Sequence, residues 1–119
     1  MGSILNSIKK LLGIPVEQDN FDTDIIIHIN SVFTTLWELG VGPEERFRIM
    51  DDVATWDDFM EDDTIYDDLK SYMYLKVRLV FDPPTSSAYM TTMKELIAEY
   101  EWRLNVKADN DANNQNGEY

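Results

Sequence analysis

Apolar residues recur every three or four positions in four stretches of the chain, and this spacing predicts four amphipathic helices. The stretches cover about residues 3–12, 21–39, 64–81 and 87–106. Residues 75–79 also alternate with the period of a strand. A run of about 17 residues without glycine or proline is long for a strand, however, and favours a helix there. The pattern therefore predicts a mainly α fold.

Helix-breaking and capping residues delimit the four stretches. The first three end at Gly13, at Gly40 and at Asp82-Pro83-Pro84. Residues with side chains that accept backbone hydrogen bonds stand at the starts of the later helices: Asp19 or Asn20, then Thr64, then Ser86 or Ser87. Asp67 would complete a partial capping box with Thr64.

The region between the second and third helices has no helical period. Phe47 and Ile49 alternate with polar residues across 44–54, which predicts a short strand or an extended loop. A single helical turn is expected within 55–63, because Thr55 and Asp58 resemble a capping box with Asp in place of Glu. This region forms an acidic, irregular insertion.

The last residues, 107–119, are dominated by Asn, Asp, Ala, Gly and Gln until Tyr119, a composition that buries too little apolar surface to fold alone. We therefore expect a four-helix domain over 1–106 and an extended polar tail over 107–119. Lys9 and Lys10 flank the apolar stripe of the first helix, so that helix could lie on a membrane surface. Its shortness favours packing on the body or on a neighbouring subunit.

The net charge limits the kinds of partner. The 119 residues include 23 acids and 10 bases, for a formal net charge of −13. This balance argues against binding nucleic acid by phosphate neutralisation and against binding an anionic membrane. The absence of cysteine excludes disulfides, thiol nucleophiles and thiolate metal sites. No stretch is typical of a signal peptide or membrane span, so we expect a protein used in the cytosol or in a particle assembled there.

The most conspicuous chemical feature is a run of nine acids in 51–68, among them Asp57, Asp58, Asp62 and Asp63. The spacing of a calcium-binding loop is absent. Three other interpretations remain: imitation of DNA phosphates, a charged surface that repels DNA or docks a basic partner, and a solvated loop that favours solubility.

No pattern in the sequence predicts catalysis, a metal site or a cofactor. Nucleophile elbows, phosphate loops and zinc-protease motifs are absent. The single histidine, His28, lies between isoleucines within the second helix and is expected to be a packing residue. Trp37, Trp56 and Trp102 could each be core residues or interface anchors. Trp102 lies beside its helix's apolar stripe but not in it, so it is the best candidate to face a partner.

The chain resembles the small head–tail connector (adaptor) proteins of long-tailed phages and prophages of Gram-positive bacteria. The resemblance rests on six stretches in order: ILNSIKKLLG at 4–13, FDTDIIIHIN at 21–30, LGVGP at 39–43, ATWDDF at 54–59, YLKVRLVFDPP at 74–84 and EWRLN at 101–105. Together they span about residues 1–106.

The resemblance implies a structural protein of the virion neck, assembled in the host bacterial cytoplasm, with no catalytic residues and no membrane contact. Such adaptors form a ring of about 12 copies beneath the portal protein and extend the DNA channel toward a stopper or tail-completion protein. By this resemblance the expected portal contacts are Trp102, Arg103, Asn105 and the tail to Tyr119.

The acids Asp57, Asp58, Asp62 and Asp63 would then line the channel, because a negative wall does not hold the double-stranded DNA that passes through. The alternative is an acidic DNA mimic that inhibits a host DNA-binding protein.

Overall fold

The chain folds into helices around a central one. A computed structural model describes the backbone of residues 2–116 and the side chains of residues 2–112. Its elements are α1 (Ile4–Leu12), α2 (Asp22–Glu38), α3 (Trp56–Phe59), the 3₁₀ turn η1 (Asp63–Ile65), α4 (Tyr66–Phe81) and α5 (Ser87–Asn116). All four predicted helices are present, and the predicted single turn is α3. The mainly α prediction is confirmed.

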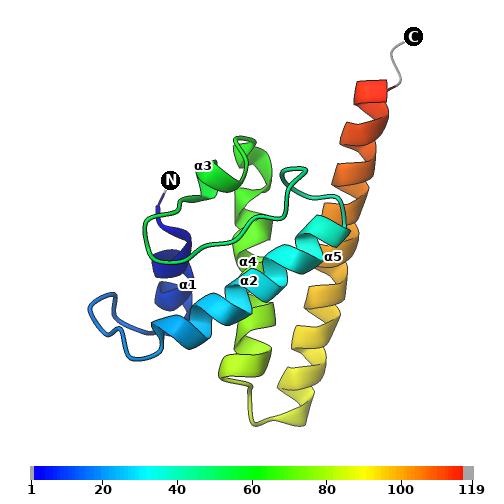
Figure 1. The fold of residues 1–119 in the computed structure, drawn as a ribbon. Helices are drawn as coiled ribbons and strands as arrows, with labels where there is room; N and C mark the ends of the chain where they lie inside the picture. The colour runs from blue at the N-terminus through cyan, green and yellow to red at the C-terminus, as the bar shows by residue number, and fades with distance from the viewer. Residues whose placement is uncertain (1, 117–119) are drawn as a thin grey trace.

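Helix α4 is the centre of the packing. It contacts α1, α2 and α5, and α2 crosses it on one side (Figure 1). The side chains between these helices form a single apolar core, in which Ile8, Ile29, Leu69 and Val77 are fully buried. None of the described helices is long and apolar enough to cross a membrane.

Most helix ends follow the predicted caps. Gly13 closes α1 with a left-handed backbone at φ 81°, and the Ser86 hydroxyl accepts a hydrogen bond from the N–H of Tyr89. The N-cap of α1, which was not predicted, is Ser3. Thr55 and Asp58 form the predicted capping box, in which each side chain accepts the other residue's backbone N–H.

Two predicted caps are wrong. Helix α2 starts after Phe21 without a side-chain cap, so neither Asp19 nor Asn20 serves. At the start of η1, the Asp62 carboxylate accepts the N–H of Thr64. The N-terminal cap is therefore Asp62, where Thr64 was predicted. Aspartate has a stronger acceptor than threonine, and it stands one position before η1 begins.

Residues 44–54 form an irregular segment with bends at 44–45 and 50–52, and the described part of the chain has no strand to pair with it. Phe47 packs edge-on against Phe33 and Phe59 with ring centroids 5.0 and 5.3 Å apart. The Asn30 side chain replaces a partner strand: its amide nitrogen donates to the carbonyl of Ile49 at 2.9 Å, and its oxygen accepts the Ile49 N–H at 2.8 Å. The alternation of Phe47 and Ile49 therefore marks an extended loop held by side chains.

The last helix is longer than predicted. Helix α5 continues ten residues past Val106, to Asn116, and its 30 residues span about 45 Å. Lys107 pairs with Asp111 one turn later and with Asp62 of the body, and the segment contains neither glycine nor proline. These features let a polar composition continue the helix. Tyr119 lies outside the described residues.

Candidate interaction surfaces

Trp102 points away from the core. Helix α5 buries Met93, Ile97 and Leu104 on the face toward the body. Trp102 stands two residues before Leu104, which is about 200° around the helix. Its side chain is 68% exposed. An exposed tryptophan on a helix whose other face is fixed in the core is typical of an interface anchor.

The two other described portal candidates already have partners within the chain. Arg103 pairs with Glu99 one turn earlier and lies 4.0 Å from a carboxylate oxygen of Asp68. The Asn105 amide donates to the Leu39 carbonyl at 3.3 Å, and so joins α5 to the end of α2. Arg103 remains exposed beside Trp102, whereas Asn105 has a structural contact within the fold.

The acidic residues fall into two groups. Asp57 accepts a hydrogen bond from the Tyr66 hydroxyl, and this bond lowers the pKa of Asp57 and raises that of Tyr66 to about 12. Asp58 completes the capping box. The pKa of Asp62 is lowered by hydrogen bonds from the side chain and backbone of Thr64 and by Lys107, 3.6 Å away. These three carboxylates therefore shape the insertion.

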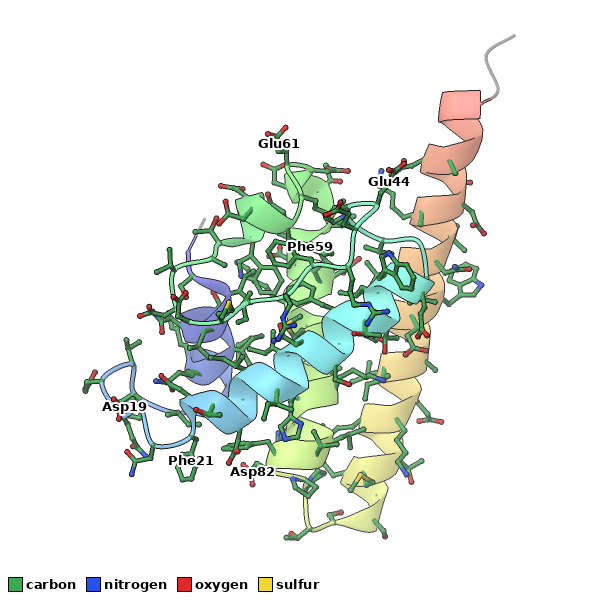
Figure 2. The ribbon with its side chains drawn as sticks, viewed as in Figure 1. Asp19, Phe21, Glu44, Phe59, Glu61 and Asp82 are labelled. Carbon is green, nitrogen blue, oxygen red and sulfur yellow. The ribbon has the colours of Figure 1, made fainter. Side chains whose placement is uncertain are left out.

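The acids of the second group are exposed, and in the described part of the chain their carboxylates make no structural contact that holds the insertion in shape. Among the described residues, Glu61, Asp63 and Asp67 form no ion pair. Glu61 lies above α3 and the start of α4, toward the end of the body opposite Asp82, and α5 extends further in the same direction (Figure 2). Of the four predicted channel-lining acids, Asp63 thus presents its charge without a structural contact.

The described surface has several hollows. A cavity of about 270 Å³ lies beneath the last turns of α5, lined by Gly40, Gly42, Met60, Leu104 and Ala108. A more open hollow of about 530 Å³ lies where α2 meets the end of α4, beside His28, Val80 and Phe81. His28 is half-buried at its edge, in keeping with the packing role predicted for it. The described residues contain no cluster of three or more His or acidic side chains able to hold a metal.

Exposed aromatic and charged side chains, of the kinds found at protein interfaces, stand on the described surface. The family described as phage connector protein matches residues 4–111, and the chain belongs to this family. No curated protein and no solved structure gives a significant match. The connector family confirms the coarse part of the resemblance, a connector component of the phage particle.

Proposed function

We propose that the chain is a non-enzymatic adaptor of the phage neck. About 12 copies would form a ring between the portal protein and a stopper or tail-completion protein, and the ring would extend the DNA channel. Assembly would take place in the host cytoplasm. Membership of the connector family supports the neck location. We further propose, from the resemblance alone, that the host is Gram-positive and that the phage has a long tail.

The observation that carries the portal contact is the exposed Trp102. Its helix extends beyond the body, so a partner can reach this face and the polar residues that follow. Arg103 adds a charge beside it. Tryptophan and arginine are the residue types that most often dominate binding energy at interfaces. We propose Trp102 as the anchor, with Arg103 and the tail through Tyr119 around it.

The acidic insertion is proposed to face the DNA. Asp57, Asp58 and Asp62 keep their positions through hydrogen bonds, and Asp63 adds exposed charge. Like charge on the channel wall would let the duplex pass without specific binding. The connector family gives no support to the alternative of a DNA mimic.

The experiment is a binding titration of the purified chain with the portal protein of the same phage. Trp102→Ala is expected to weaken binding at least tenfold, because loss of a buried anchor costs about 2 kcal/mol or more. The control is Val80→Ala, which removes another apolar side chain that is 62% exposed but lies on α4. If the wild type does not bind the portal, the proposed function is wrong. If the wild type binds the portal and Trp102→Ala binds as tightly, the assigned anchor is wrong.

A further inference from the structure

The loop before α3 exposes apolar side chains without an evident role in the fold. Met50 is 81% exposed and Val53 is 74% exposed, more than any other large apolar side chain among the described residues. Asp51 and Asp52 lie between them, and both are exposed. We call residues 50–53 the apolar–acidic loop.

This loop is held firmly at both ends. Before it, the Asn30 side chain makes two hydrogen bonds to the backbone of Ile49. After it, the carbonyl of Ala54 accepts the N–H of Ile4 at 3.0 Å. Within it, Asp51 accepts the N–H of Val53 at 3.0 Å. A loop that is ordered before binding loses less conformational entropy when a partner docks.

Helix α4 carries a surface of the opposite character. Residues 69–81 contain no acid and three bases, in a chain of net charge −13. Lys70, Tyr74 and Arg78 follow one another at four-residue intervals and so form one ridge along the helix. The Arg78 guanidinium donates to the Tyr74 hydroxyl at 3.0 Å and lies 5.5 Å from the ring centroid of Tyr89 on α5.

We call Lys70, Tyr74, Arg78 and Tyr89 the α4 ridge. Acids flank it only at its ends, Asp67 before Lys70 and Asp82 after Arg78. Lys70 forms no ion pair among the described residues, and Tyr89 is 55% exposed. The ridge thus offers positive charge and aromatic surface together.

The contacts of the loop and of the ridge place them on different sides of the molecule. Helix α2 covers the side of α4 that carries Lys76 and Val80, since both line a hollow with His28. Arg78 is two residues from each, which places it about 200° around α4 and away from α2. The loop follows Ile49, which is bonded to α2. Two separate surfaces of this kind suit head-to-tail contacts between copies, and such contacts form a ring when the rotation between neighbours closes.

We propose that the apolar–acidic loop of one copy docks on the α4 ridge of a second copy. Met50 and Val53 would pack on Tyr74 and Tyr89, and thioether–aromatic contacts are favourable. Asp51 and Asp52 would face Lys70 and Arg78. The charges would set the register and the apolar contacts would supply most of the affinity.

This inference rests on the proposed ring and names its subunit contact. Copies of charge −13 repel one another. Electrostatic repulsion therefore opposes least a contact that brings an acidic segment onto a surface whose centre carries bases and no acid. The ridge is such a surface. The proposed portal anchor on α5 and the acids of 57–63 stay outside the contact, so the three surfaces can act together.

The absence of native cysteine makes disulfide trapping specific. Val53→Cys and Ser71→Cys are prepared separately, one with a size tag, and then mixed under oxidising conditions with and without portal protein. Ser71 lies on α4 between Lys70 and Tyr74. Disulfides form only when the two Cα atoms come within about 7 Å, so a mixed dimer reports the docked geometry. The matched control replaces Ser71→Cys by Thr91→Cys, an exposed position on α5.

The expected result is a mixed Val53→Cys/Ser71→Cys dimer that the Thr91→Cys control lacks. A second variant, Met50→Ser/Val53→Ser, should weaken self-association about tenfold or more, since it exposes less apolar surface to bury. Because both side chains are already exposed, the variant is expected to keep its fold.

The outcomes separate the two proposals. One outcome is that the wild type binds portal while Val53→Cys and Ser71→Cys, mixed with or without portal, form no more mixed dimer than the Thr91→Cys control. In that case the contact is wrong and the neck function stands. If the mixed dimer forms but the chain ignores portal, the contact stands and the neck function fails. If Val53→Cys is trapped on portal or on another neck protein instead, the loop serves a different partner and the contact is overturned.

Discussion

The ammonium nitrogen of Lys9 lies 2.8 Å from carboxylate oxygen Oδ1 of Asp22, although Lys9 is fully buried. The same ammonium donates to the carbonyls of Val16 and Gln18, at 2.9 and 2.7 Å. One side chain of α1 therefore fixes both the loop that follows and the first turn of α2.

Replacing this lysine should be costly. We expect Lys9→Met to lower the free energy of unfolding by about 3 kcal/mol, because it leaves Asp22 and two carbonyls without their cation. Urea unfolding measures the change. The double variant Lys9→Met/Asp22→Asn should recover part of the loss, and Lys10→Met, at an exposed position, should change stability by less than about 0.5 kcal/mol. Equal effects at the two lysines would contradict the buried role of Lys9.

Two glycines with similar backbones should respond differently to alanine. A Cβ on Gly42 would lie 2.5 Å from the Phe59 ring, whereas one on Gly13 would meet nothing within 4 Å. Both residues have positive φ, so each alanine incurs about 1–2 kcal/mol of backbone strain. Gly42→Ala should lose a further 1–3 kcal/mol or so to the clash. Thermal unfolding of the pair tests this, and equal losses would show that the Phe59 ring moves aside.

Two tyrosines should resist alkaline titration. The hydrogen bond to Asp57 raises the pKa of Tyr66 to about 12. The pKa of Tyr72 is raised above its usual range, mainly by burial and secondly by the hydrogen bond to Glu101. A raised pKa stabilises the fold below pH 10, and this contribution is lost as the pH rises above 10. Tyrosinate absorbance should show a late phase that shrinks in Tyr66→Phe and in Tyr72→Phe. An unchanged late phase in both variants would contradict the assignment.

The proposed domain boundary can be tested by truncation. A chain ending at Val106 keeps the buried Leu104. It loses the ion pair between Lys107 and Asp62, and it loses Ala108, which lines the cavity beneath α5. We expect it to fold with a loss of about 1 kcal/mol, since exposed ion pairs contribute little. Circular dichroism should show less helix, and portal binding should fall. Lys107→Met is the control for the ion pair alone.

Charge and structure in the acidic insertion can be separated. Glu61→Gln/Asp63→Asn removes two exposed charges and should leave stability within about 0.5 kcal/mol of the wild type. In assembled particles it should slow DNA passage if these acids face the channel. Asp58→Ala should instead lower stability by about 1 kcal/mol through loss of the capping box. Normal DNA release by the double variant would argue against the channel wall.

Local signals in the sequence predicted the helices and most of their ends. The apolar spacing, Gly13 and the Thr55–Asp58 pair each act through neighbours in the chain, so they could be recognised without a structure. The exposure of Trp102 was also predictable, because its position outside the apolar stripe follows from helical spacing alone.

The features that depend on distant residues could not be predicted. Lysine is seldom buried, and nothing near Lys9 in the sequence shows that two loop carbonyls and Asp22 converge on it. Residues 107–116 have the composition of a disordered tail, whereas the Lys107–Asp62 contact joins them to a segment far along the chain. The α4 ridge was missed because its two bases, Lys70 and Arg78, lie within a stretch that was interpreted only for its apolar stripe.

The three tryptophans differ enough in environment to act as built-in optical reporters. Trp56 is fully buried, with its indole nitrogen 3.2 Å from the Ser7 hydroxyl. Trp37 lies half-exposed beneath the Arg46 guanidinium, and Trp102 faces solvent. Emission from Trp56 should follow unfolding, whereas emission from Trp102 should shift to the blue only when its face is covered. Unlabelled protein can therefore distinguish loss of the fold from docking within a single spectrum.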